Sequence, residues 1–437
     1  MNTIRAWQAV RRAILGVILA STLTDAAVRA QTPAPVPAPE AAASLSEAIK
    51  GGKLLLNLRP RWENVSQDMK PEHANALTLR SLIGWRTLPF HGFSVTVEGI
   101  DVSHLGEQEF ATTRTDPRFA EYPIVADPDD TDINQLYLDY TGVAATRLRV
   151  GRQSIKLDNV RFLGNVEFRQ VMQVFNAAMV ENTSLPNTRL TAGYLWRQKN
   201  ILGDEHDLDM PVLNARYTWK PGNDLTGYAY LQDQDITGQA LKNTASTSAF
   251  TDNSNQIYGV RANGAYGFGE TLKLLYTAEY AKQDDYSGGD TRIDARYWRL
   301  GAGPQLGDWF MRIDYEVLSS NDGRYGFQTP LGTNHLFQGW ADQFLTTPAQ
   351  GIRDLYVSAG GKIAKLGMYL EAHKFESDFG NIDFGHEIDV GLTYPLFKGL
   401  TGKIEYADYR AGDAVSGDSL ANKVDVRKFW LTLVYQY

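Results

Sequence analysis

Apolar and polar side chains alternate with a period of two, in segment after segment, from residue 53 to the last residue of the chain. Residues 53–64 read KLLLNLRPRWEN, and residues 308–318 read DWFMRIDYEVL. Because neighbouring side chains of a β-strand point to opposite faces, each such segment predicts a strand with one apolar and one mostly polar face. A sheet of such strands separates an apolar medium from water, which is typical of a transmembrane β-barrel.

The alternating segments number eighteen, which is an even number. The predicted strands are 53–64, 76–87, 92–102, 131–141, 145–155, 169–182, 187–198, 209–220, 224–235, 253–266, 270–283, 291–303, 306–318, 350–363, 365–378, 381–395, 400–412 and 424–437. We therefore predict an all-β fold, a transmembrane antiparallel up-and-down β-barrel of about 18 strands.

The connections between the predicted strands alternate in length. The long connections are 65–75, 103–130, 156–168, 199–208, 236–252, 284–290, 319–349 and 413–423. Links of one to four residues lie between them, and one short link, Phe379–Gly380, falls where a long one is expected. Outer-membrane barrels have short periplasmic turns and long extracellular loops, so this order places both ends of the barrel on the periplasmic side.

The N-terminal segment predicts export. Residues 1–30 combine a basic start, an apolar stretch at Ala13–Leu23 and small residues at Val28–Ala30, which indicates a cleaved signal peptide. A membrane anchor is the alternative, but a spanning helix needs roughly 20 apolar residues. Residues 31–43 form a Pro/Ala-rich linker, and residues 44–437 are predicted to form the barrel.

The C-terminal strand has a strong signature of its own. Aromatic and aliphatic residues occupy alternate positions in Phe429–Tyr437, and the chain ends on an aromatic residue. Bacterial outer-membrane barrels commonly end in this way, and we predict that the barrel-insertion machinery recognises this strand. Aromatic residues at the strand ends also fit two interfacial girdles. They are Trp62, Trp85, Tyr140, Trp219, Tyr266 and Tyr394.

The polar faces of the predicted strands are rich in arginine. If the apolar faces meet lipid, nine arginines point into the lumen: Arg59, Arg61, Arg80, Arg147, Arg149, Arg216, Arg261, Arg299 and Arg312. Guanidinium groups in a pore attract carboxylates and phosphates, so these residues are candidate ligand-binding groups. The alternative is that they pair with lumen acids and brace the wall. We expect ligand contact above all from Arg59, Arg61, Arg147 and Arg149.

Other chemistry is weakly indicated. The loop Glu121–Asp132 carries aspartates at alternate positions, which fits calcium or, more simply, a solvated acidic turn. The seven histidines show no metal-ligand spacing, and no nucleophile motif is present. We therefore expect no metal, no cofactor and no catalysis. His373 and Glu371 share a lumen face, which we interpret as a solvated part of the pore wall.

Composition limits the possible partners and covalent cross-links. The chain has a formal net charge of −8, which argues against nucleic acid as a partner. It has no cysteine, so disulfides and thiolate chemistry are excluded.

Several stretches resemble the alginate export porin family. The most specific are GRQSIKLDNVRF at Gly151–Phe162 and GWADQFLTTP at Gly339–Pro348, and the likeness extends over residues 44–437. The resemblance implies an eighteen-stranded monomeric barrel with an arginine-rich conduit, and it adds Arg152 to the candidate conduit residues. It also implies a long loop folded inward, for which we expect residues 103–130. The turn Leu396–Gly399 departs from the family, whose exporter has a long turn there.

Together these features predict a channel in the outer membrane of a Gram-negative bacterium, in contact with lipid and lipopolysaccharide. The expected cargo is an anionic saccharide or small acid, with polyuronate export as the specific form. A general solute uptake porin is one alternative. A plugged barrel that serves as a structural or adhesion scaffold, through loops 103–130 and 319–349, is another.

Overall fold

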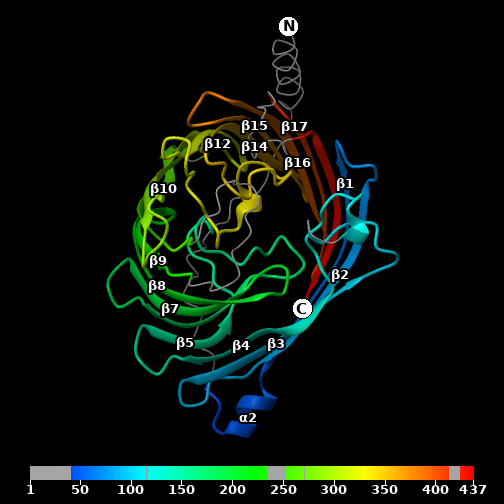
Figure 1. Cartoon of the computed structure of the whole chain (residues 1–437). Helices are drawn as coiled ribbons and strands as arrows, with labels where there is room; N and C mark the ends of the chain where they lie inside the picture. Colours follow the sequence, from blue (N-terminus) through cyan, green and yellow to red (C-terminus); the bar gives the residue numbers. More distant parts are fainter. Residues whose placement is uncertain (1–40, 114–116, 235–251, 270, 413–423) are drawn as a thin grey trace.

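The chain forms a closed antiparallel barrel of 18 strands in the computed structural model (Figure 1). The structure describes residues 41–113, 117–234, 252–269, 271–412 and 424–437. The predicted signal peptide and most of the linker lie outside the described residues. The predicted fold class and the number of strands are confirmed.

The strand bounds agree with the predicted ranges to within five residues. They are β1 (Lys53–Gln67), β2 (Ala74–Arg86), β3 (Phe93–His104), β4 (Asp130–Tyr140), β5 (Thr146–Gln153), β6 (Val174–Asn182), β7 (Thr188–Lys199), β8 (Glu205–Lys220), β9 (Asn223–Gln232), β10 (Asn255–Phe268), β11 (Leu272–Asp285), β12 (Asp294–Leu306), β13 (Trp309–Leu318), β14 (Ile352–Ile363), β15 (Leu366–Glu376), β16 (Asp383–Phe397), β17 (Leu400–Arg410) and β18 (Val426–Gln436). The largest difference is at β6, because residues 169–173 were predicted as strand and lie in the loop before it.

Each strand pairs with its sequence neighbours, and the first strand closes the barrel with the last. Lys53 of β1 faces Arg86 of β2, and Asn57 of β1 faces Gln436 of β18. Closure satisfies the backbone groups of both edge strands, which is the requirement for a sheet within lipid. We call the two ends of the barrel the turn end, which carries the short connections, and the loop end, which carries the long ones.

The two faces of the wall differ as the alternation predicts. On β13, Ile313 is 55% exposed on the outer face, whereas the neighbouring Asp314 is 1% exposed inside. Among the predicted girdle residues, Trp62, Trp219, Tyr266 and Tyr394 are exposed on the outside. No helix in the described part of the chain has the length and apolar character that a membrane span requires.

A short helix, α2 (Leu45–Lys50), precedes the barrel at the turn end. Ser44 caps its N-terminus by accepting a hydrogen bond from the Glu47 amide, as is usual for serine at this position. The indole of Trp85 on β2 donates to the carbonyl of Ile49 at 2.9 Å, so the helix is fastened to the rim.

The loop expected to fold inward does so only in part. Phe110 and Val125 are buried in the same apolar core as Phe162, and in the described part of this loop the Glu109 carbonyl also accepts from the Asn75 amide at the loop end of β2, at 3.1 Å. Most of the interior is filled by the β5–β6 loop (residues 154–173) and the β13–β14 loop (residues 319–351). The second of these, drawn in yellow, crosses the middle of the barrel with its short 3-10 helix Asn334–Leu336 (Figure 1).

Gly151 lies in the last residues of β5, shortly before the chain leaves the wall as the β5–β6 loop. Its φ of 128° is open to glycine alone in practice, and a Cβ there would lie 2.3 Å from the Leu136 carbonyl oxygen. This explains why the GRQ motif begins with glycine.

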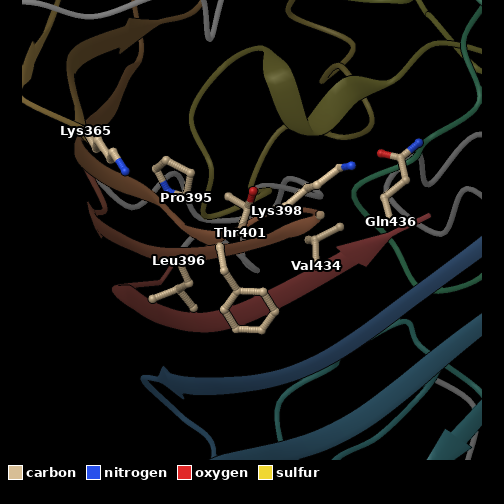
Figure 2. A pocket seen from close by; sticks show the side chains of 9 residues that line it. Lys365, Pro395, Leu396, Lys398, Thr401, Val434 and Gln436 are labelled. Atoms are coloured by element: carbon tan, nitrogen blue, oxygen red, sulfur yellow. The ribbon is translucent and has the colours of Figure 1, made fainter.

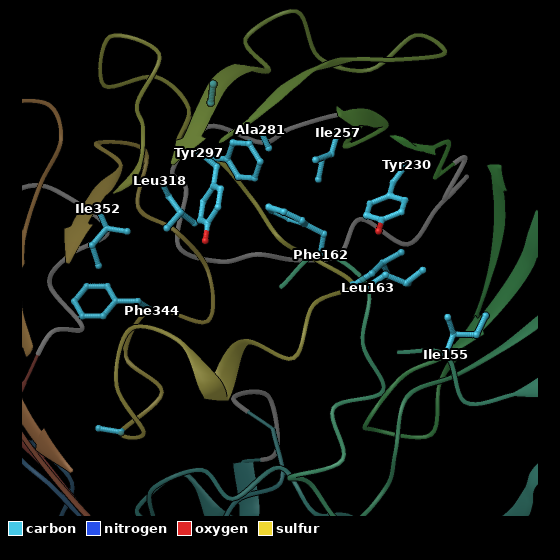
Figure 3. Packing of buried hydrophobic residues seen from close by; sticks show 14 of the residues in the cluster. Ile155, Phe162, Leu163, Tyr230, Ile257, Ala281, Tyr297, Leu318, Phe344 and Ile352 are labelled. Carbon is cyan, nitrogen blue, oxygen red and sulfur yellow. The ribbon is translucent and has the colours of Figure 1, made fainter. Parts of the chain in front are cut away.

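An apolar core holds both loops inside the barrel (Figure 3). Phe162 of the β5–β6 loop packs against Tyr228 and Tyr297 of the wall and against Phe327 of the β13–β14 loop, at ring distances of 5.2–5.8 Å. Burying an aromatic side chain of this kind contributes roughly 1.5–3 kcal/mol. The loop end of the lumen is therefore packed like a protein interior, while the apolar belt outside faces lipid.

Candidate functional site

Most of the predicted lumen arginines brace the wall. Arg149 holds Asp139 on the neighbouring strand with two bonds of 2.8 Å and lies 3.8 Å over the Tyr137 ring. Arg299 and Arg312 both bind Asp314 at 2.9 Å. Arg216 binds Asp158 of the β5–β6 loop at 2.8 Å, and Arg261 lies 3.6 Å from Glu279. Each of these arginines therefore lies against a carboxylate, and Arg299 and Arg312 share the carboxylate of Asp314.

Two further candidates lie at the rims. Arg147 and Arg189 share the carboxylate of Glu181 at 3.5 and 3.6 Å near the turn end, and the Arg147 side chain is 46% exposed. One acid for two guanidinium groups leaves positive charge in contact with water. Arg152 connects β4 to β8 through Asp132 and Glu205, so it clamps the wall where β5 turns inward.

Three of the ten predicted lumen arginines have no ion-pair partner among the residues that the structure describes: Arg59, Arg61 and Arg80, which are each 3–5% exposed. We call this group the basic wall. Arg59 and Arg80 face each other directly in the register of β1 and β2. The structure brings them together because inward positions of two paired strands lie side by side.

The β5–β6 loop covers the basic wall with acceptors. Arg59 donates to Gln170 Oε1 at 2.8 Å, to the Glu167 carbonyl at 2.7 Å and to the Arg169 carbonyl. Arg61 lies 4.3 Å below the Phe168 ring, and its Nη1 has no hydrogen-bond partner. Peptide carbonyls carry only partial charge, so the positive charge of the basic wall is screened and not cancelled.

Both inward loops meet at Asp342. Its carboxylate binds Lys428 of β18 at 2.7 Å, His335 at 2.8 Å and Arg169 of the β5–β6 loop at 3.1 Å. Burial by itself raises the pKa of Asp342, but the neighbouring Lys428, His335 and Arg169 outweigh burial and hold its pKa well below the usual value. Asp342 therefore stays charged and ties two loops to the wall.

Further contacts join the two loops into one body, which we call the plug (residues 154–173 and 319–351). The Gly164 amide donates to the Leu331 carbonyl at 2.9 Å, and the Thr333 amide donates to the Val160 carbonyl at 2.9 Å. Arg161 binds the buried Glu316 of β13 at 3.0 Å. The plug is held by backbone bonds inside it and by ion pairs to the barrel.

A second part of the lumen wall, separated from β1 by β17 and β18, carries acids. Asp354, Glu371, Glu387 and Asp389 lie on β14, β15 and β16, are at most 8% exposed, and form what we call the acidic wall. The β13–β14 loop covers it with donors: the Ala341 amide donates to Glu387 at 2.6 Å, and the Trp340 amide to Asp389 at 3.4 Å. The expectation that Glu371 and His373 form a solvated wall is wrong, because both side chains are buried under the plug.

The turn end of the lumen holds a hollow of about 560 Å³ (Figure 2). Lys365 and Lys398 lie at its edge, on the β14–β15 and β16–β17 turns, and Val434 and Gln436 of β18 line its floor. The β16–β17 turn consists of Lys398 and Gly399 alone, two residues shorter than the predicted short turn Leu396–Gly399. Anions that approach this mouth therefore meet two lysine side chains.

The aspartates of the loop before β4 are each bound by protein groups. Asp127 accepts from the Gln170 amide at 2.8 Å, Asp129 accepts from the His104 amide at 2.7 Å, and Lys199 binds Asp130 and Asp132 at 2.7 and 2.8 Å. Asp127 and Asp129 point to separate partners, and the position between Asp130 and Asp132 is occupied by the Lys199 ammonium group, so the four carboxylates do not converge on one metal ion. These contacts hold the loop against the rest of the protein. The alternative of a solvated acidic turn applies only to the exposed part of the loop.

Sequence reasoning missed Arg169, Asp342 and Lys428, which hold the plug. Arg169 and Asp342 are 173 positions apart, and no periodicity relates them. A signal was present, because Asp342 lies in the GWAD stretch and Arg169 in the stretch that follows the GRQ motif. Family-specific motifs with charged residues in long loops were the sign of inward contacts.

The fold and the charged, loop-filled lumen define the class: this is a porin-type transmembrane β-barrel. The family model for alginate export matches residues 94–335, more than half of the chain. The protein belongs to the alginate export family, as the motifs predicted. No curated protein has a matching sequence.

Solved outer-membrane porins share the fold. OccAB2 of Acinetobacter baumannii superposes with a TM-score of 0.69 at 14% identity, over 90% of this chain and 99% of that chain. OccK9 (OpdG) of Pseudomonas aeruginosa gives 0.68 at 15% identity, over 89% and 99%. OpdK of Pseudomonas aeruginosa, solved with vanillate, gives 0.65 at 14% identity, over 89% and 99%. Family membership and the porin-type barrel together support an outer-membrane channel.

Proposed function

We propose that the protein is a channel of the Gram-negative outer membrane that passes anionic, carboxylate-bearing solutes. The observation that carries this proposal is the basic wall: three adjacent buried arginines without an ion-pair partner in the described part of the chain. A buried charge that the protein leaves uncompensated is costly to stability, and it is kept where it serves a ligand.

Selectivity in such a lumen does not require direct contact with the solute. Fixed charges in low-dielectric walls focus their field into the water-filled part of a pore and raise the local concentration of counter-ions. The lysines of the turn-end hollow and the shared pair Arg147 and Arg189 extend this positive field to the mouth that the loop order assigns to the periplasm.

The size of the cargo is limited by the plug. Residues 154–173 and 319–351 occupy the lumen and are fixed to it at Asp342 and Arg161. We therefore favour small acids and short anionic saccharides over a polymer. The vanillate in the OpdK structure is a small carboxylate of this kind. Export of a polyuronate is the second candidate, supported by family membership, and it requires that the plug leaves the lumen.

The barrel is proposed to function as a monomer in contact with lipid and lipopolysaccharide, inserted through its C-terminal strand. We propose no catalytic role, because the family and the similar structures are channels. The scaffold alternative predicts a barrel without current.

Ion selectivity in planar bilayers tests the proposal. The wild-type protein is expected to give an anion-selective current, measured as the reversal potential in a KCl gradient. Arg61→Gln and Arg80→Gln are each expected to reduce the anion preference. Arg312→Gln is the matched control, because it removes one lumen charge while Arg299 still compensates Asp314.

A larger effect of Arg61→Gln and Arg80→Gln than of Arg312→Gln supports the basic wall as the selective element. Equal effects would show that only total lumen charge matters, and a non-selective wild-type current would overturn the proposal. Absence of any current would favour the scaffold.

A further inference from the structure

We propose that the acidic wall holds a divalent transition-metal ion, of the zinc type, bound by Glu371, His373 and Asp389. The three side chains come from the paired strands β15 and β16, and one ligand atom from each lies within 4.8 Å of the other two. The site is separate from the basic wall and does not rest on the proposed function.

The distances fit a shared ion. His373 Nε2 lies 3.6 Å from Glu371 Oε2 and 3.7 Å from Asp389 Oδ2. These separations are too long for hydrogen bonds. Ligand atoms that each lie roughly 2.0–2.2 Å from one zinc ion are about 3–3.6 Å apart, close to what is observed.

The histidine is prepared as a ligand. His373 is 6% exposed, and its Nε2 has no hydrogen-bond partner although it points into the carboxylates. Its Nδ1 lies 3.0 Å from both oxygens of the buried Asp354. A carboxylate on one imidazole nitrogen fixes the tautomer that presents a lone pair on the other, which is the usual arrangement behind a metal-bound histidine.

Packing fixes the orientation of this ring. His373 is stacked between Tyr356 and Phe375, with ring centroids 4.8 and 5.3 Å away. A ring held on both faces loses little freedom when it binds an ion, so the site is preorganised.

The charge balance calls for a cation. The acidic wall has four carboxylates, and among the described residues their only ion-pair partner is His373. Glu387 Oε2 and Asp389 Oδ1 are buried without a hydrogen-bond partner. A divalent ion would neutralise much of this excess, which burial otherwise makes costly.

The ligand types select the ion. Calcium and magnesium prefer sites made of oxygen alone, whereas imidazole with carboxylates suits zinc and its first-row neighbours. Three protein ligands leave a fourth position for water, and Glu387 Oε2, buried without a hydrogen-bond partner on the same strand face as Asp389, is available to accept a hydrogen bond from such a water. The ion would then also stabilise the β13–β14 loop, whose amides hold Glu387 and Asp389.

Metal binding to the detergent-solubilised protein tests the site. After treatment with EDTA and dialysis, the wild type is expected to take up one zinc ion per chain, measured by mass spectrometry of the metal and by titration calorimetry. Cobalt(II) is expected to give the visible absorption of a four- or five-coordinate site with nitrogen and oxygen ligands.

His373→Asn removes Nε2 but keeps an amide that can donate to Asp354, and it is expected to weaken zinc binding more than about 100-fold. Asp354→Asn is expected to weaken it about 10–100-fold, as loss of an outer partner usually does. His386→Asn is the matched control, because His386 neighbours Glu387 but points away from the lumen. If His373→Asn does not fold, Glu371→Gln serves in its place.

Zinc uptake that is unchanged by both His373→Asn and Glu371→Gln, or lost equally in His386→Asn, would assign the metal to surface groups and overturn the proposal. A wild type that takes up no zinc would also overturn it. In that case the carboxylates of the acidic wall share protons instead.

Discussion

The basic wall on β1 and β2 and the acidic wall on β14–β16 line one lumen with two strands between them, and the plug contacts them with opposite ends of its peptide groups. Over the basic wall, residues 167–170 present carbonyl oxygens to Arg59. Over the acidic wall, residues 339–341 present backbone amides to Glu387 and Asp389. A peptide group has both an N–H donor and a C=O acceptor. The backbone of the plug can therefore pair with arginine side chains through its carbonyls and with carboxylates through its amides.

The difference lies in what remains uncompensated. An excess of carboxylates can be relieved by bound protons or by a metal ion, because carboxyl groups protonate near neutral pH when they are buried. Arginine stays charged under all physiological conditions, so an arginine excess can be relieved only by an anion. The acidic wall is thus suited to a permanent ion, and the basic wall to a passing one.

Asp342 is the contact on which this division most depends, because it joins the two loops that cover the walls. Asp342→Asn leaves Arg169 and Lys428 without their shared carboxylate, and the expected cost is about 3–5 kcal/mol. We expect the plug to detach, with higher single-channel conductance and faster proteolysis within residues 319–351. Asp322→Asn is the control on the same loop, since that side chain is 80% exposed. Unchanged conductance in Asp342→Asn would show that the apolar core alone holds the plug.

Acid should release the same contact. The pKa of Asp342 is lower in the folded protein than in the unfolded chain, because Lys428, His335 and Arg169 outweigh its burial. Its stabilisation is therefore complete above the unfolded pKa of about 3.9 and is lost as the pH falls through the folded pKa. We expect constant conductance from pH 7 to about 4 and a rise below that. Asp342→Asn should lack this step, and a rise already at pH 5–6 would assign release to other groups.

The acidic wall can be disturbed by itself at Gly339. This residue has a φ of 82°, and a Cβ would lie 2.4 Å from Glu387 Oε2. Gly339→Ala is expected to cost about 1–3 kcal/mol in thermal unfolding and to loosen the amide contacts to Glu387. Gly380→Ala is the control, because Gly380 has a φ of 89° but no atom nearer than 3.8 Å. Equal losses in both variants would leave backbone strain as the only cause. Anion selectivity should not change in either.

The smallest effect is expected at the basic wall. Arg80→Gln removes a charge without an ion-pair partner in the described chain, so the free energy of unfolding should change by less than about 1 kcal/mol, or rise. Arg149→Gln should cost about 1–3 kcal/mol, because Asp139 loses both bonds. Thermal unfolding in detergent compares the two. A larger loss for Arg80→Gln would mean that the basic wall is structural.

Strand positions were predictable because a barrel wall has a local rule. The period of two assigns each residue to lipid or lumen without knowledge of any other strand, and Asp314 and Ile313 lie where it predicts. The same rule placed Arg59, Arg61 and Arg80 inside. It could not tell them from Arg149, because whether a lumen arginine meets an acid depends on register and on neighbouring strands.

Loop placement was not predictable for the same reason. Residues 103–130 and 154–173 are both long and polar in part. The second carries Phe162 and Arg161 to partners on distant strands, whereas the first is buried only in part, at residues such as Phe110. Length indicated that a loop could fold inward, but complementarity to the lumen decided how much of each loop did.

The sequence by itself determined that this chain is a closed barrel with an apolar outside and a charged inside, and to which family it belongs. Those properties depend on side-chain alternation and local motifs, which each segment carries alone. Tertiary structure decided which charges are cancelled, which remain and how the lumen is filled. Electrostatic energy depends on distances of a few ångströms between groups that are far apart along the chain, and only closure of the barrel and folding of its loops set those distances.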